Sequence, residues 1–384
     1  MRKFSLWALA ALAITACDPT VEPLPIPTTN KLVSTSIKTN TTWYADTVYQ
    51  LTGRIAVEDG ATLTIQPGTI IKGEAGTGSN ATALLIARGG KLIAEGTASA
   101  PIIFTSVADE ITPQLVAAGN FASPNLDPTI NGLWGGVIVL GKARISASNT
   151  AGDVTSVQIE GIPTSDQNGL YGGTDDNDNS GIISHVSIRH GGANIGSGNE
   201  INGLTLGGVG ALTSVNNVEV VANQDDGIEF FGGTVSVSYA VVWNSGDDAI
   251  DTDQSWSGEL NNFVLISPAD HCFELDGPEG SYAAGHLIHY GDIYVGTGKD
   301  LINVDNNSIV DLKHLYFTDI PTTNSKINRT TAAGVTFQNI VLNVDTVAKY
   351  INGTLPPSAV VEGQILKANT STLGWTWAKQ AGKF

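Results

Sequence analysis

The chain has 384 residues and a formal net charge of −18 at pH 7, from 19 basic and 37 acidic side chains. Such a surface repels phosphate, so nucleic acid and anionic lipid are poor partners, whereas cations and neutral glycans suit it. Glycine accounts for 44 residues, and charged side chains for only 15%. This composition is unlike that of a helical or a disordered protein and favours one large, elongated β domain.

The N-terminus has the pattern of a secretion signal. Arg2 and Lys3 supply positive charge, and the apolar stretch after them is shorter than the about 20 residues that a membrane-spanning helix needs. The sequence ITAC at 14–17 resembles the lipobox of bacterial lipoproteins. By that resemblance, residues 1–16 are a lipoprotein signal peptide and Cys17 is the lipidated first residue of the mature chain. The alternative is an ordinary signal peptide followed by a chance cysteine.

Residues 17–30 are the expected link between the lipid anchor and the folded part. They hold four prolines and no periodic apolar pattern, which predicts a semi-rigid tether of about 40 Å. No later segment is apolar for long enough to cross a bilayer, so we expect a chain held in the cell envelope by lipid alone. The outer membrane, with the protein facing outward, is the preferred address, and the inner membrane stays open as the alternative.

From residue 31 to residue 384 the sequence consists of strands and turns within a single domain. Alternating apolar residues over 61–66 are followed by Pro67-Gly68 and a second apolar run, and no segment has a long helical period. Further on, an aspartate-rich segment recurs at offsets of 22 and 23 residues; its copies are 225–229, 247–251, 270–274 and, more loosely, 299–303. A constant interval of this length predicts an all-β fold, a right-handed parallel β-helix or solenoid.

A second set of strand-like segments extends the repeat along the domain. Its copies begin at His185, Asn217, Tyr239, Asn262, His286, His314 and Asn339. Alternate apolar residues of these strands should stack in the lumen of the solenoid. The pattern breaks at about 108–131, which predicts a side loop. We expect covers at the N- and C-terminal ends of the stack, the C-terminal one over about 345–384.

The aspartate-rich segments also predict a column of carboxylates. Alternation along the strands turns one set of acidic residues outward: Glu229, Asp251, Asp253, Glu274 and Asp276. Like charges on neighbouring coils, about 4.8 Å apart, raise one another's pKa unless a cation, shared protons or solvent compensates. Oxygen-rich clusters suit calcium, so a metal site is expected among Asp226, Asp248, Asp251 and Asp253. The alternative is a solvated acidic face whose turn aspartates cap backbone N–H groups.

The same column allows a catalytic interpretation. Glu229 and Asp251 on adjacent coils would approach the roughly 5–5.5 Å separation of a retaining glycosidase pair. Glu229 and Glu274 would approach the roughly 6.5–9.5 Å separation of an inverting pair. The Gly-His-Gly and Arg-x-Lys signatures associated with polygalacturonases are absent. A polysaccharide hydrolase or lyase that uses Glu229, Asp251 and Glu274 is therefore the alternative function, which the spacing permits without requiring.

A separate calcium signal lies outside this column. Asp176, Asp178 and Ser180 have the spacing of the first half of an EF-hand-type loop. The distal glutamate of such a loop is missing, because its position is occupied by Ser187. A calcium site completed by ligands from elsewhere and an Asx-rich turn are the two interpretations that remain.

Aromatic residues supply the candidate contacts to sugar. Trp243 and Trp256 fall in the acidic half of the chain and are possible stacking platforms; with Glu229 and Asp276 they form the expected ligand-binding set. Cys272 lies inside a repeat and is expected to be a buried thiol with no catalytic role.

Several motifs taken together resemble a known family. The segments are 60–65, 91–97, 134–136, 159–161, 171–173, 202–206 and 225–233. As a set they are similar to right-handed β-helix lipoproteins on the surface of Bacteroidota-type bacteria. The resemblance implies the fold and the cell-surface address, and it carries over no activity. The leading prediction is therefore a non-catalytic binding or structural module, stabilised by calcium, for a glycan or another cell-surface component such as a protein.

Overall fold

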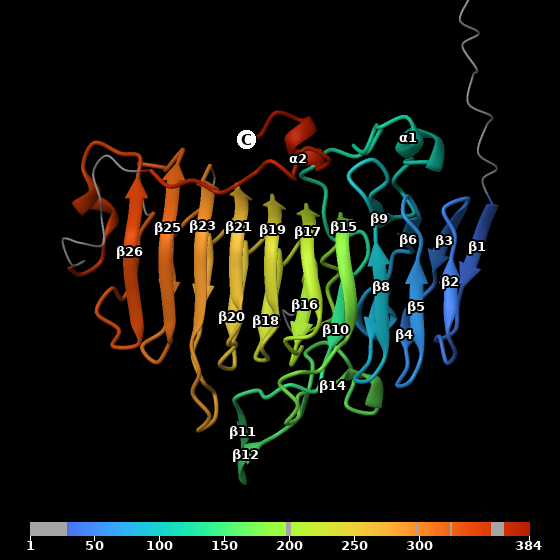
Figure 1. Ribbon diagram of the computed structural model, residues 1–384, viewed down its shortest axis with the longest axis horizontal. Helices are drawn as coiled ribbons and strands as arrows, with labels where there is room; N and C mark the ends of the chain where they lie inside the picture. The colour runs from blue at the N-terminus through green and yellow to red at the C-terminus, as the bar shows by residue number, and fades with distance from the viewer. Residues whose placement is uncertain (1–28, 197–200, 297, 323–324, 355–364) are drawn as a thin grey trace, which may run out of the picture.

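The computed structural model describes residues 29–196, 201–296, 298–322, 325–354 and 365–384. The predicted signal peptide, Cys17 and nearly all of the tether lie outside these residues. The described chain is almost entirely β, and its two long sheets consist of parallel strands. Figure 1 shows these strands side by side along the long axis of the molecule. The predicted all-β parallel solenoid is thus confirmed.

The smaller of the two long sheets has eight strands. In chain order they are β4 (Arg54–Val57), β7 (Ala83–Ile86), β10 (Val137–Leu140), β16 (Leu204–Gly207), β18 (Ile228–Phe231), β20 (Ile250–Asp253), β22 (Phe273–Leu275) and β24 (Asn303–Val304). Neighbouring strands pair in one register, so equivalent residues of successive coils lie beside one another; Leu204, for example, pairs with both Val137 and Ile228.

The larger sheet has fourteen strands. Seven belong to the first coils: β1 (Thr29–Val33), β2 (Thr41–Trp43), β3 (Thr47–Leu51), β5 (Thr62–Ile65), β6 (Ile70–Gly73), β8 (Lys91–Glu95) and β9 (Ile102–Ser106). Seven longer strands follow: β15 (Gly181–Arg189), β17 (Ser214–Val221), β19 (Ser236–Trp243), β21 (Glu259–Ile266), β23 (His286–Tyr294), β25 (Val310–Thr318) and β26 (Val335–Leu342).

Each long strand bends at one residue in the left-handed backbone region. These residues are His185, Asn217, Tyr239, Asn262, Tyr290, His314 and Asn339, with φ between 49° and 57°. In the first coils the same bend separates two strands, because β8 and β9 pair with β15 on either side of His185. The bend therefore divides the larger sheet into two faces, and the smaller sheet provides the third face of each coil.

The positions of these bends also correct one copy in the predicted second set of strand-like segments. The sequence places the copy after Asn262 at His286, but the structure places it at Tyr290. The reason is the strand pairing, in which Phe263 lies opposite Gly291. The insertion that lengthens this coil consequently lies between β22 and β23, before His286.

Inward side chains from the three faces fill the lumen and form one continuous apolar core. Aromatic rings stack within it: Phe230 lies against Trp256 with ring centroids 3.9 Å apart, and Phe263 contacts Phe273 at 5.8 Å. Cys272 is a free, buried thiol, as predicted. Burial raises the pKa of this thiol and keeps it in its unreactive, uncharged form.

Residues 141–180, which we call the excursion, leave the solenoid and fold over the outer face of the smaller sheet. The excursion contains β11 (Ala147–Asn149), β12 (Gly152–Val154), β13 (Val157–Gln158), η2 (Gln167–Gly169) and β14 (Leu170–Tyr171). Its Ile145, Ile159 and Tyr171 share one buried apolar cluster with Leu85 and Ile138 of the sheet. The N-terminal half of this outer face is therefore covered by the chain itself.

Residues 365–384, which we call the strap, run back along the larger sheet (Figure 1, red). The backbone N–H of Ala368 donates to Asp292 Oδ1 on β23 at 3.1 Å, and that of Asn369 donates to Asn262 Oδ1 on β21 at 2.9 Å. The strap ends in α2 (Trp377–Gln380). The predicted C-terminal cover thus contains a segment that crosses the side of the solenoid, while η3 (Val347–Tyr350) follows the last long strand.

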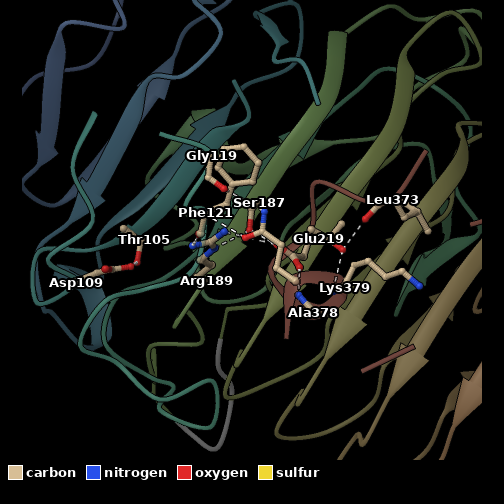
Figure 2. A network of polar contacts seen from close by, with 12 residues as sticks. Thr105, Asp109, Gly119, Phe121, Ser187, Arg189, Glu219, Leu373, Ala378 and Lys379 are labelled. Carbon is tan, nitrogen blue, oxygen red and sulfur yellow. Dashed lines mark hydrogen bonds and ion pairs between the residues drawn. The ribbon is translucent and has the colours of Figure 1, made fainter. Parts of the chain in front are cut away.

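A buried polar network holds the end of the strap (Figure 2). Arg189 of β15 and Glu219 of β17 are fully buried, with 3.7 Å between Nη2 and Oε2. Ser187 Oγ accepts a bond from Arg189 Nε and donates one to Glu219 Oε2, each 2.7 Å long. Glu219 Oε1 accepts the backbone N–H of Ala378 in α2 at 2.9 Å. Because buried charges are costly without partners, the bond from Ala378 to Glu219 favours this position of α2.

The predicted side loop at 108–131 contains α1 (Pro113–Ala117). Phe121 in this loop accepts a hydrogen bond from Arg189 through its carbonyl oxygen. Gln380 of α2 donates to Gly119 O at 3.3 Å, so the loop and the strap meet over the larger sheet. The remaining short helix, η1 (Gly78–Asn80), precedes β7.

Candidate functional site

The predicted carboxylate row is present on the outer face of the smaller sheet. Glu229 of β18 lies opposite Asp251 of β20, and Asp251 lies opposite Glu274 of β22. Glu274 lies in turn opposite Asn303 of β24, whose Nδ2 donates to Glu274 Oε1 at 3.1 Å. The register follows from parallel pairing with a fixed coil length, which is why the interval in the sequence identified the row.

Asp253 and Asp276 lie near this row. Asp253 ends β20 and lies opposite Phe231, and Asp276 follows β22 with its backbone N–H bonded to Thr252 O at 2.8 Å. We call the surface formed by Glu229, Asp251, Asp253, Glu274 and Asp276 the acidic face. At its C-terminal end Arg329 donates to Asp305 Oδ1 at 3.0 Å and to Val304 O at 2.7 Å.

The aspartates in the turn before the row have the backbone role that the sequence left as the alternative. Asp226 Oδ1 accepts the backbone N–H of Asp248 in the next coil at 3.0 Å. Asp248 Oδ1 accepts that of His271 at 2.7 Å, and Asp300 Oδ1 accepts that of Lys326 at 2.9 Å. These aspartates therefore connect successive coils through one carboxylate oxygen each, and the second oxygen of Asp300 accepts Asn328 Nδ2 at 2.7 Å.

His271 is a member of the site that the sequence analysis missed. It pairs with Asp300 across coils and takes the place of Asp248 in its own coil. Burial lowers the pKa of His271, but the hydrogen bond to Asp248 and the charges of Asp248 and Asp270 outweigh this effect and raise it to about 9. This raised pKa favours the protonated, positively charged form of His271 at neutral pH, next to Asp248 and Asp270. An alignment of the repeat copies Asp247-Asp248 and Asp270-His271 places His271 at the position of Asp248, and this would have identified it as a member of the site.

Three carboxylates converge at the buried end of the acidic face. One oxygen from each of Asp226, Glu229 and Asp251 lies within 4.8 Å of the others. Asp226 and Glu229 are only 7% and 6% exposed. Asn202 Nδ2 donates to Glu229 Oε2, whereas the buried Oδ1 of Asp251 has no hydrogen-bond partner among the described residues. A buried carboxylate oxygen without a donor is costly, so this cluster is suited to a cation or to shared protons.

The pKa values of the acidic face reflect the same burial and the same repulsion between carboxylates. Burial, and then the charge of Asp251, raise the pKa of Glu229 well above its ordinary value. Burial and neighbouring carboxylates likewise raise the pKa of Asp253 to about 7, of Glu274 to about 8 and of Asp276 to about 6. Perturbed carboxyls gathered on one face are a mark of functional sites.

The loop with Asp176, Asp178 and Ser180 lies elsewhere, and its carboxylates have protein partners. Asp176 forms an ion pair with Arg144, which lowers the pKa of that carboxyl. Asp178 Oδ2 accepts the Ser180 hydroxyl at 3.1 Å. Backbone N–H groups of the turn bond to Asp175 and Asn179 side chains, as in an Asx-rich turn. We therefore leave this loop out of the proposed metal site.

The two tryptophans predicted as sugar platforms are not on the surface. Trp256 is 1% exposed and stacks on Phe230 in the lumen, and Trp243 is 3% exposed and packs edge-on against Trp377 of the strap. Neither ring can contact a ligand without a change in the fold, so this prediction is wrong. The sequence could not reveal the burial of Trp243, because it results from a segment more than a hundred residues away.

Comparison with known families agrees with the fold. Residues 35–373 match the model of the pectate-lyase-like β-helix domain, which covers most of the chain, and the protein belongs to this family. No curated protein and no solved structure matches the chain significantly. Membership of the family fits a carbohydrate-related function in general. In the part of the chain that the structure describes, no helix is long and apolar enough to span a membrane.

Proposed function

We propose that this protein is a lipid-anchored protein of the cell envelope that binds a glycan at the acidic face through a calcium ion. The observation that carries the proposal is the cluster of Asp226, Glu229 and Asp251, three carboxylates within 4.8 Å of one another. Calcium takes six to eight oxygen ligands, so a cation held by three carboxylates keeps positions for sugar hydroxyls.

The charge of the cluster favours a bound cation rather than a solvated acidic surface without one. The carboxylates are buried and repel one another, which raises the pKa of Asp226, Glu229 and Asp251. A divalent cation would offset this repulsion and give Asp251 Oδ1 a partner. The charges of Asp253 and Asp248, the other two predicted ligands of the column, also raise the pKa of Asp251, and these residues would complete the coordination through a free oxygen or through water.

The anchor is part of the proposal and is supported by the sequence of the N-terminus alone. The ITAC sequence resembles a lipobox, and Cys17 is its cysteine. Expression of the full chain with labelled palmitate tests it: label is expected in the wild-type protein and absent from Cys17→Ser. Fractionation of the membranes then separates the preferred outer membrane from the inner one.

Calcium binding is the direct test of the site. Isothermal titration should show calcium binding to the wild-type protein, at least about tenfold weaker binding to Asp251→Asn, and unchanged binding to Asp345→Asn, an exposed control. A glycan array probed with and without chelator should then show binding that depends on calcium. A wild-type protein that binds no calcium, with array signals unchanged by chelator, would contradict the proposal.

A polysaccharide hydrolase or lyase is the second candidate function. It is favoured by the raised pKa values of about 8 for Glu274 and about 7 for Asp253, which keep protonated carboxyls available as general acids near neutral pH. Release of cleavage products from an array glycan, with loss of turnover in Glu229→Gln at an unchanged melting temperature, would establish the enzyme and reject the non-catalytic function.

A further inference from the structure

A cavity of about 220 Å³ lies where the excursion meets the loop after β22. Hairpin β11–β12 lines it with Ala147 and Val154, and the loop lines it with Ser281 and Tyr282. The volume is smaller than the roughly 300–1,000 Å³ of sites for drug-sized ligands. It therefore suits a group the size of a single ring.

The lining combines apolar and polar groups. Ala147, Val154 and the ring of Tyr282 form apolar surface, while Arg144, Asp153 and Ser281 belong to the polar lining. A sugar ring has a matching pair of surfaces, an apolar face of C–H groups and a rim of hydroxyls. Aromatic side chains provide rigid apolar surface for such a face, and the polar residues provide donors and acceptors for the rim.

The polar lining is held in place before any ligand arrives. The Arg144 guanidinium lies over the Tyr282 ring, 5.0 Å from its centroid, and Arg144 Nε donates to Asp176 Oδ2 at 2.8 Å. Asp153 Oδ1 accepts the backbone N–H of Ser281 at 3.0 Å, which ties the hairpin to the loop. Side chains fixed in this way lose little entropy on binding, which favours affinity.

The cavity is adjacent to the acidic face. Gln254 directly follows Asp253, and its Nε2 donates to Glu279 Oε2 at 3.1 Å. Gln254 O accepts the backbone N–H of Ser146, a lining residue, at 2.8 Å. One residue therefore connects the end of the acidic face to both walls of the cavity.

We propose that this cavity is a sugar subsite, which binds one ring of a glycan against the side of Tyr282 that Arg144 leaves open, while the neighbouring rings lie on the acidic face. The subsite rests on the proposed glycan-binding function and adds a determinant of specificity to it. A hydroxylated, uncharged ring is the expected occupant, since Arg144 already has Asp176 as its counter-ion.

The test uses the full chain and the oligosaccharide with the strongest calcium-dependent signal on a glycan array. Isothermal titration should show binding to Tyr282→Ala weakened at least about tenfold, as for a central aromatic contact, and binding to Tyr282→Phe within about threefold of wild type. Tyr44→Ala, which removes an exposed tyrosine near the N-terminal end of the solenoid, is the control and should leave affinity unchanged.

The outcomes separate the subsite from the function on which it rests. If the wild-type protein binds no glycan, both the proposed function and the subsite are rejected. If Glu229→Gln weakens binding but Tyr282→Ala does not, the subsite alone is rejected. Should Tyr282→Ala fail to fold, Ser281→Trp places a bulky ring in the cavity from an exposed position, and unchanged affinity in that variant rejects the subsite.

Discussion

The two halves of the outer face of the smaller sheet have the same backbone and opposite chemistry. One continuous row of paired residues runs from Ala56 through Leu85 and Ile138 to Glu229 and then, in the later coils, to Asp251 and Glu274. In the first half the row is apolar and covered by the excursion. In the second half it is acidic.

A solenoid can separate stability from function along its axis. Each coil contacts mainly its neighbours, so a change in one coil leaves distant coils in place. The covered half converts its outer face into a second apolar core, whereas the acidic half keeps a set of mutually repelling carboxylates that a bound cation or shared protons would stabilise. Three measurements test this difference between the two halves.

The largest effect is expected in the covered half. Leu85 is fully buried beneath the excursion, so Leu85→Ala should lower the free energy of unfolding by about 2–5 kcal/mol through lost burial and a residual cavity. Urea denaturation followed by circular dichroism measures it. A change under about 1 kcal/mol would mean that the excursion does not pack against the sheet as a core.

The next effect is the pH dependence of the acidic half. Asp253 and Glu274 have folded pKa values of about 7 and about 8, above those of the unfolded chain, so the folded protein binds more protons than the unfolded one between about pH 4 and those values. Stability should therefore fall by a few kcal/mol as the pH rises from 5 to 9 in chelator. Denaturation at several pH values measures it, and the same series with calcium should be flatter. Stability that rises over this range in chelator would contradict the raised pKa values.

The smallest effect is expected from one neutral substitution on the acidic face. Glu274→Gln removes a charge that is present at pH 9 and absent at pH 5, so it should stabilise the protein by about 1 kcal/mol at pH 9 and leave it unchanged at pH 5. The melting temperature at both pH values measures it, with Asp345→Asn as the exposed control. Equal shifts at the two pH values would show that the effect is not electrostatic repulsion.

Some features of this protein are determined by the sequence alone. The offsets of 22 and 23 residues fix the length of a coil, and the alternation in each strand fixes which side chains face outward. Together they predict the solenoid and the row of Glu229, Asp251 and Glu274, because a parallel stack places equivalent positions side by side. The predicted strand register was wrong only at His286, because an insertion before this residue changed the interval between successive coils.

What covers each outward face depends on contacts between segments that are distant in the sequence. Alternation cannot distinguish solvent from another segment of the chain, so the burial of Trp243 by the strap and of Leu85 by the excursion could not be read from periodicity. The same limit hid the cavity at Tyr282, whose walls come from segments more than a hundred residues apart. Local pattern determines the direction of a side chain, whereas contacts between distant segments determine its environment, its pKa and its availability to a ligand.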